Sequence, residues 1–91
     1  MDIFKILQDI IDQRKQDPKP GSYTNYLLDT KGLVERKINE EAYEVIEASL
    51  NNDTASIIEE SADLFYHMLV MLSKRGITID DICDALEKRR S

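Results

Sequence analysis

The segment from residue 54 to residue 74 carries apolar residues on two opposite sides when it is wound as a helix at about 100° per residue. One side holds Ile58, Ala62, Phe65 and Leu69, and the other holds Leu64, Met68 and Met71. Such a helix needs to be buried, and a chain of 91 residues has few ways to surround it completely. We therefore expect a second copy of the chain to cover one side, in a homodimer. In the alternative arrangement, Met68 and Met71 pack under the first helix of the same chain.

The rest of the sequence also predicts helices, bounded by capping and turn residues. Asp2, Ser22 and Asp53 stand where N-caps are expected, and Thr78 with Asp81 resembles a capping box in which Asp replaces Glu. No strand alternation, internal repeat or low-complexity tract is visible. The sequence therefore predicts an all-α fold of four to five helices in a single domain, 1–91. The predicted helices cover residues 3–16, 23–29, 33–50, 54–74 and 79–90.

The composition excludes several classes of partner. A net charge of −6 argues against a general nucleic-acid binder, which needs a basic face. The longest run without a charged residue, 64–73, is too short to span a bilayer. The chain opens without a basic and apolar leader, and the single cysteine, Cys83, has no partner for an intrachain disulfide. We therefore expect a cytoplasmic protein that binds neither nucleic acid nor membrane.

Two acidic pairs lie on consecutive predicted helices. Glu41 and Glu44 are three residues apart, as are Glu60 and Asp63, so the members of each pair point to one side of their helix. If the helices pack antiparallel across the short turn at 51–53, the four carboxylates face one another and need a cation. Oxygen ligands favour Mg²⁺, with Mn²⁺ as the alternative, and either ion can in turn bind phosphate. The other interpretation is a solvated acidic surface, which we expect for Glu47 and Glu59.

Lys37 and His67 stand close to these pairs. Lys37 precedes Glu41 by four residues and lies on the same stripe, a spacing that allows a salt bridge between them. His67 follows Asp63 by four residues on the same stripe. The chain has no Glu-x-x-His step of the kind found in di-iron bundles, so we expect His67 to be a hydrogen-bonded histidine in the core or at an interface.

Three motifs carry a resemblance to a known family. They are G-S-Y-T at 21–24, K-x-x-E-E-A-x-E at 37–44 and E-S-A-D-L-x-Y-H-x-L-V at 60–70. With these motifs the chain resembles the phosphoribosyl-ATP pyrophosphatases of histidine biosynthesis, within the wider MazG-like all-α nucleotide pyrophosphatases, and the resemblance extends over essentially the whole chain. It implies a MazG-like helical fold whose four-helix core is completed by dimerisation. It also implies Mg²⁺-dependent hydrolysis of phosphoribosyl-ATP to phosphoribosyl-AMP and pyrophosphate.

With this resemblance, the motif residues take expected roles. The metal ligands are expected to be Glu41, Glu44, Glu60 and Asp63. Glu40 or Glu41 is the candidate for orienting the attacking water. The candidates for substrate binding are Ser22, Tyr23, Thr24, Arg36 and Lys37, although the first three stand at a loop-to-helix junction where they can instead be ordinary caps.

Two other functions stay open at this level. One is a house-cleaning nucleoside triphosphate pyrophosphatase of the MazG-like class, against which the G-S-Y-T motif argues. The other is a non-catalytic helical dimerisation module in which the acidic residues are only solvated. A separate cyclohydrolase is a possible partner of the histidine-pathway enzyme, because we expect no room for a fused one in 91 residues.

Overall fold

Five helices make up the part of the chain that the structure, a computed structural model, describes. It describes residues 2–90, so Met1 and Ser91, the ends of the predicted domain, lie outside the described residues. This range contains no strand, and none of its helices is long and apolar enough to cross a membrane. The all-α prediction is confirmed, and the helix bounds differ from the predicted ones only at the last residue of α5. The helices are α1 (Ile3–Gln16), α2 (Tyr23–Asp29), α3 (Leu33–Leu50), α4 (Thr54–Lys74) and α5 (Ile79–Arg89).

The helices begin where the capping residues predicted. Asp2 and Asp53 accept hydrogen bonds from the first turns of α1 and α4, and Ser22 accepts one from the first turn of α2. Thr78 and Asp81 form a complete capping box at α5. Because each cap satisfies backbone N–H groups that have no partner within the helix, these short polar side chains determine where the helices start.

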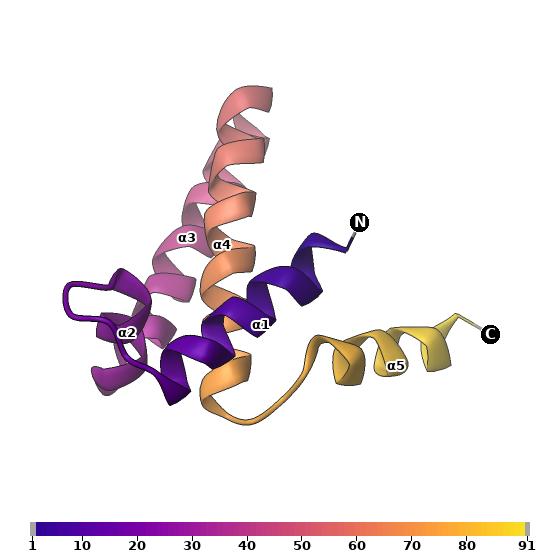
Figure 1. Ribbon diagram of the computed structural model, residues 1–91. Coiled ribbons are helices and arrows are strands. Elements are labelled where there is room, and N and C mark those ends of the chain that lie inside the picture. Colours follow the sequence, from indigo (N-terminus) through magenta and orange to yellow (C-terminus); the bar gives the residue numbers. More distant parts are fainter. Residues whose placement is uncertain (1, 91) are drawn as a thin grey trace.

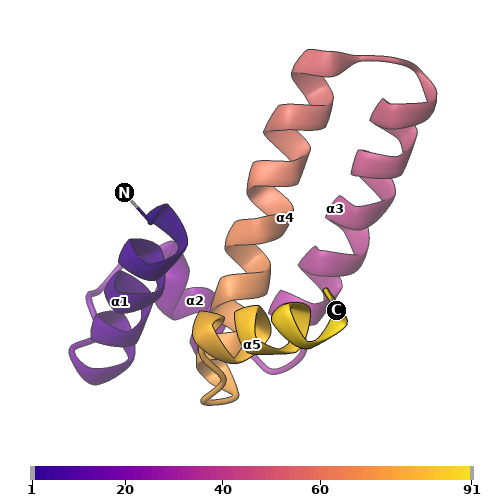
Figure 2. The same ribbon diagram turned by 90° about the vertical axis from the view of Figure 1, so that its right-hand side faces the viewer.

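α3 and α4 form an antiparallel hairpin, the longest feature of the molecule (Figures 1 and 2). The turn between them holds Asn52 at a φ of 56°, in the left-handed region that Asn tolerates. The other three helices lie toward the opposite end of the hairpin, so its turn end projects alone (Figure 2). Residues in the middle of α3 and α4 therefore face each other on an arm that the rest of the chain leaves accessible.

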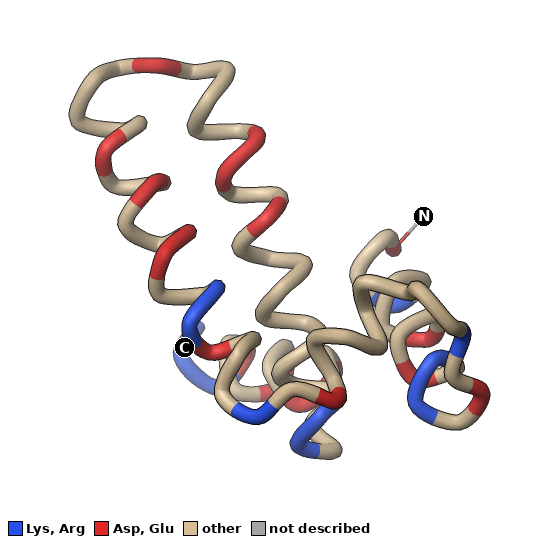
Figure 3. The backbone as a smooth tube through the Cα atoms, turned by 90° about the vertical axis from the view of Figure 1, so that its left-hand side faces the viewer, with Lys and Arg blue, Asp and Glu red and all other residues tan. Residues whose placement is uncertain are grey.

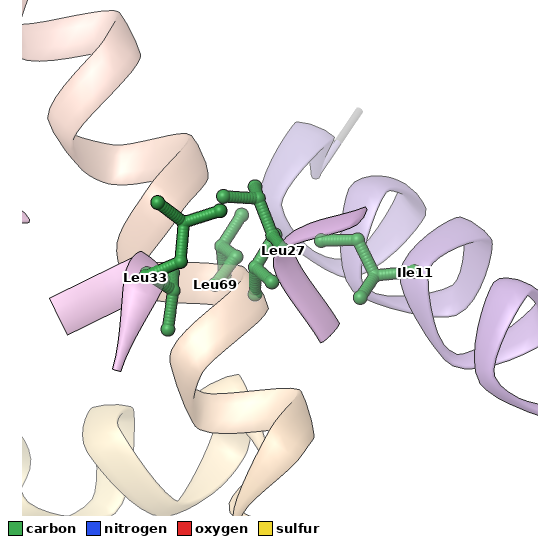
Figure 4. Packing of buried hydrophobic residues seen from close by; sticks show 6 residues of the cluster. Ile11, Leu27, Leu33 and Leu69 are labelled. Carbon is green, nitrogen blue, oxygen red and sulfur yellow. The ribbon is translucent and has the colours of Figure 1, made fainter. Parts of the chain in front are cut away.

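The apolar core lies at the base of this hairpin (Figure 4). Four helices contribute to it, and Leu27, Val34 and Val70 are fully buried. α5 contributes no buried residue, so its Ile82 and Leu86 stay exposed within the chain. The core thus fixes one end of the hairpin and leaves its turn end to be held by α3 and α4 alone. The buried apolar residues of the cluster are Ile11, Leu27, Leu33, Val34, Leu69 and Val70.

The two apolar sides of α4 have different surroundings. Leu69 is buried, and Met71 packs against the core that α1 helps to build. Ile58, Phe65 and Met68 are exposed, with 65%, 49% and 38% of their surfaces accessible. Packing under the first helix therefore accounts for Met71 but not for the rest of the apolar surface, and a homodimer stays a prediction.

A buried asparagine shapes the loop that precedes α2. Asn25 Oδ1 accepts a hydrogen bond from Lys19 N at 2.9 Å, and its Nδ2 donates one to Arg14 O at 2.8 Å. The Asn25 backbone N–H also donates to the Ser22 hydroxyl at 3.2 Å. One side chain therefore ties the end of α1, the proline-containing loop and the start of α2 together, which fixes the position of the 21–24 segment.

We expect Asn25→Ala to lower the free energy of unfolding by about 1–3 kcal/mol, because it removes two hydrogen bonds made by a buried side chain. Urea denaturation followed by circular dichroism measures the change. Gln16→Ala, which shortens an exposed amide side chain close to the same loop, is the control and should stay within about 0.5 kcal/mol of the original protein. Equal stabilities of the two variants would contradict this role of Asn25.

Candidate functional site

Three carboxylates converge between α3 and α4. One oxygen from each of Glu41, Glu60 and Asp63 lies within 4.8 Å of the others. Glu41 is buried, with 8% of its surface exposed, whereas Asp63 is exposed. Glu44 joins the group through a hydrogen bond with Glu60. Figure 3 shows the acidic positions along the two arms of the hairpin. The antiparallel packing thus brings together all four side chains that the sequence predicted; we call them the carboxylate cluster.

Electrostatics within the carboxylate cluster favour a bound proton or cation. The hydrogen bond with Glu44, then partial burial and the neighbouring negative charges, raise the pKa of Glu60 to about 7. Burial raises the pKa of Glu41, and the charges of Asp63 and Glu44 act in the same direction, while His67 acts against them. Two carboxyl groups that hold protons more tightly than usual mark a site where negative charge lacks compensation.

The donor set fits a hard divalent cation. Glu41 Oε1 is buried and accepts no hydrogen bond from the described residues. A buried carboxylate oxygen that accepts no aligned hydrogen bond is uncommon in folded proteins, and a bound cation would satisfy it. Because all the converging atoms are carboxylate oxygens, Mg²⁺ or Mn²⁺ fits this set better than a metal that prefers nitrogen or sulfur ligands.

His67 connects the carboxylate cluster to α2. Its Nδ1 lies 2.5 Å from Glu41 Oε1 and 2.8 Å from the backbone oxygen of Asp63. Its Nε2 lies 2.8 Å from the hydroxyl oxygen of Tyr23. Next to this contact, the hydroxyl of Thr24 is hydrogen-bonded to that of Tyr66. The prediction of a hydrogen-bonded histidine is confirmed, but helical spacing gave no indication of the contacts with Glu41 and Tyr23, which come from other helices.

Tyr23 also lines a cavity of about 670 Å³ beside the 18–29 segment. Lys19, Ser22 and Tyr26 line it too, so it offers a cation, a hydroxyl and two aromatic rings to a bound molecule. Burial and the charge of Glu41 raise the pKa of Tyr23, which keeps its phenol protonated. The ring of His67 lies between Tyr23, which lines this cavity, and Glu41 of the carboxylate cluster. Ser22 itself caps α2, as the alternative interpretation expected.

The basic candidates lie beside the carboxylate cluster. Lys37 Nζ is 3.7 Å from a carboxylate oxygen of Glu40, so the predicted salt bridge to Glu41 is replaced by one to the adjacent residue. This follows from burial, because Glu41 turns toward α4 while Glu40 is exposed alongside Lys37. Arg36 is exposed on the first turns of α3. Neither Glu40 nor Arg36 belongs to the carboxylate cluster. The acidic residues expected to be solvated, Glu47 and Glu59, are exposed.

These features place the chain among all-α proteins that gather four carboxylates between two antiparallel helices, here next to a cavity lined by Tyr23, Tyr26 and Lys19. The model of the family described as phosphoribosyl-ATP pyrophosphohydrolase matches residues 4–90. The chain belongs to this family. It is 46% identical over 91 residues to a phosphoribosyl-ATP pyrophosphatase of Limosilactobacillus fermentum, covering 98% of this chain and 85% of the relative. It is 43% identical over 90 residues to that of Bacillus mycoides, with 97% and 83% covered.

We expect the free energy of unfolding of the metal-free protein to fall as the pH rises from about 5 to 8. The pKa of Glu60 is raised from 4.5 to about 7, so the folded chain holds a proton that the unfolded chain releases, and that stabilisation is lost as pH passes the folded pKa. Glu60→Gln should reduce this slope. Urea denaturation at several pH values with a chelator present measures it, with the exposed neighbour variant Glu59→Gln as the control. Identical slopes for the two variants would contradict the assignment.

Proposed function

We propose that the chain hydrolyses phosphoribosyl-ATP to phosphoribosyl-AMP and pyrophosphate, the second step of histidine biosynthesis. The observation that carries this proposal is the carboxylate cluster, found in a chain of the phosphoribosyl-ATP pyrophosphohydrolase family. Both relatives described above are named as phosphoribosyl-ATP pyrophosphatases, and the chain spans more than four-fifths of each. A cytoplasmic location and a separate cyclohydrolase partner stay predictions from the sequence.

Glu41, Glu44, Glu60 and Asp63 would hold Mg²⁺, or Mn²⁺ in its place. Bound there, the ion would draw in phosphate oxygens and offset the charge that develops on the leaving pyrophosphate. The reaction joins a water oxygen to the α-phosphorus and breaks the bond from that phosphorus to the oxygen that bridges the α- and β-phosphates. Glu41 is the better placed of the two candidates for orienting this water, because it lies in the carboxylate cluster, whereas Glu40 is paired with Lys37 outside it.

The substrate would lie between the carboxylate cluster and the cavity beside α2. Tyr23 and Thr24 hold the start of α2 against α4 through His67 and Tyr66, which supports a role for the 21–24 segment in recognition. Ser22 would act with them from its capping position. Lys37, with Arg36 one residue before it, offers positive charge to phosphate oxygens. This placement uses the cavity as the pocket for the part of the substrate that is not phosphate.

The exposed apolar surface supports the proposal of a homodimer. A groove of about 350 Å³ is lined by Phe4 of α1, Phe65 and Met68 of α4, and Ile82 and Leu86 of α5. The rings of Phe4 and Phe65 meet edge to face with centroids 5.8 Å apart. An apolar surface that spans three helices is typical of an interface between subunits. In a dimer, two hairpins would complete the four-helix core.

We expect the purified protein with Mg²⁺ to release pyrophosphate from phosphoribosyl-ATP, and not from ATP, dUTP or dCTP. Glu44→Gln and Asp63→Asn should each reduce the rate by about 100-fold or more and abolish the rise in Tm that Mg²⁺ causes, because they remove ligand charge. Glu47→Gln and Glu59→Gln neutralise exposed carboxylates on the same helices and are the matched controls. Circular dichroism checks that all four variants stay helical.

Each other outcome of this assay has a definite meaning. Turnover of ordinary nucleotides in place of phosphoribosyl-ATP would favour the house-cleaning class. Full activity of both Glu44→Gln and Asp63→Asn would reject the metal-site assignment. An inactive chain whose Tm does not respond to Mg²⁺ would favour the third interpretation, a non-catalytic helical dimerisation module.

We expect sedimentation analysis to find a dimer, and Met68→Lys to shift the equilibrium toward the monomer, because it places a charge in the apolar groove. Lys31→Glu, a larger change of charge at an exposed position before α3, is the control and should stay dimeric. A monomeric original protein, or a dimer that tolerates Met68→Lys as well as Lys31→Glu, would contradict the use of this surface.

A further inference from the structure

His67 is buried, with 7% of its surface exposed, and it contacts two helices besides its own. One edge of its ring faces Glu41 on α3, and the other faces Tyr23 on α2. We propose that His67 is a positioning residue: it fixes the carboxylate of Glu41 and the hydroxyl of Tyr23 relative to each other, so that the carboxylate cluster and the 21–24 segment act on one substrate. This inference rests on the proposed function.

The neighbours of His67 determine which ring nitrogen carries a proton. Both atoms near Nδ1 are oxygen acceptors, the backbone oxygen of Asp63 at 2.8 Å and Oε1 of Glu41 at 2.5 Å. Nδ1 is therefore protonated, since a lone pair there would face two others. In the neutral ring Nε2 then offers only a lone pair, and it accepts the hydrogen of the Tyr23 hydroxyl at 2.8 Å. The Tyr23 hydroxyl thus donates to His67 Nε2, and His67 Nδ1–H donates to the Asp63 backbone oxygen with Glu41 Oε1 beside it.

The two contacts at Nδ1 have different effects. The hydrogen bond to the Asp63 backbone oxygen joins His67 to the preceding turn of its own helix and fixes the orientation of the ring. The contact with Glu41 Oε1 lacks hydrogen-bond alignment. That oxygen therefore lies next to the N–H with its lone pairs still available to a ligand. A carboxylate held in this way is oriented for a further ligand, and partners of this kind tune the affinity of metal sites.

The edge at Nε2 determines where Tyr23 lies. The rings of Tyr23 and His67 meet at 87° with centroids 5.8 Å apart, so the hydroxyl approaches the ring edge and not its face. About half of the Tyr23 surface is exposed, and that part lines the cavity beside the 18–29 segment. His67 therefore fixes one wall of this cavity from beneath, at the same time as it orients a carboxylate of the cluster.

Amide replacements separate the two edges of the ring. His67→Asn places an amide near Nδ1, so it keeps a donor for the Glu41 side but does not reach Tyr23. His67→Gln places an amide near Nε2, so it keeps an acceptor for Tyr23 and loses the donor beside Glu41. His67→Phe keeps the ring and loses both. Tyr23→Phe removes only the hydroxyl.

We expect the His67→Asn and His67→Gln variants to change Mn²⁺ affinity and KM separately. Mn²⁺ titration of the metal-free protein measures the affinity, and steady-state kinetics measures KM. His67→Phe should weaken Mn²⁺ binding by about tenfold or more and raise KM. His67→Asn should keep nearly the original Mn²⁺ affinity and match the rise in KM of Tyr23→Phe, about fivefold for one hydrogen bond. His67→Gln should show the reverse pattern. Adding Tyr23→Phe to His67→Phe should raise KM no further, because the shared contact is already lost.

Gln8→Leu is the control for a merely structural role. Gln8 is as buried as His67, with 6% exposed, and it bonds to Ile77 O and Ile79 N near the far end of α4. We expect it to lower stability without changing Mn²⁺ affinity or KM. If the His67 variants behave like Gln8→Leu, with lower stability and unchanged Mn²⁺ affinity and KM, the positioning role is wrong.

A metal-free readout keeps this inference separate from the proposed function. His67 is the single histidine, so a ¹⁵N spectrum of the imidazole is unambiguous. We expect the Nδ1–H tautomer, with Nε2 shifted by Tyr23→Phe and Nδ1 shifted by Glu41→Gln. A protein that neither binds Mn²⁺ nor hydrolyses phosphoribosyl-ATP would reject the proposed function even if this spectrum is as expected. An Nε2–H tautomer whose ¹⁵N chemical shifts do not change in Tyr23→Phe would overturn the role of His67 even in an active enzyme.

Discussion

Repulsion within the carboxylate cluster opposes the packing of α3 against α4. Four carboxylates meet between two helices, and one of them, Glu41, is 8% exposed. Charges brought this close at reduced dielectric push the helices apart. The apolar core at the base of the hairpin, with Leu69 and Val70 of α4 packed against Leu33 and Val34 of α3, holds them together. The core and the cluster oppose each other, and a cation at the cluster would relieve the repulsion without altering the core.

The short N-terminal elements bring specific groups to this hairpin. α2 has only seven residues: Leu27 anchors it in the apolar core, and polar contacts fix its start. Asn25 fixes its start to the end of α1, and Tyr23 and Thr24 fix it to α4. This arrangement places the accessible part of Tyr23 beside a cavity and its hydroxyl beside His67. The loop with Pro18 and Pro20 and the short helix α2 thereby form one wall of the site.

The helices and the carboxylate cluster were both predictable from local patterns. Caps and turn residues gave the helix bounds, because each of these residues acts within three or four positions of itself. The three-residue spacing of Glu41 and Glu44, and of Glu60 and Asp63, places each pair on one face of its helix. The three-residue turn between α3 and α4 then favours antiparallel packing of these two helices. Contacts between distant helices were not predictable in this way. The approach of His67 to Glu41 does not follow from spacing on one helix. On α3 itself, spacing allows Lys37 to pair with Glu40 or with Glu41, and the burial of Glu41 decides between them.

The local features follow from the amino-acid sequence alone: five helices, their ends, and which acidic residues share one side of a helix. Periodicity and capping operate between residues a few positions apart, so one amino-acid sequence is enough to specify them. Which of those residues come into contact depends instead on how the helices pack. The distance between His67 and both Glu41 and Tyr23 depends on how α2, α3 and α4 pack around one apolar core. Packing decides this because a buried side chain contacts residues that lie far from it in sequence, and its partners are determined by shape and volume.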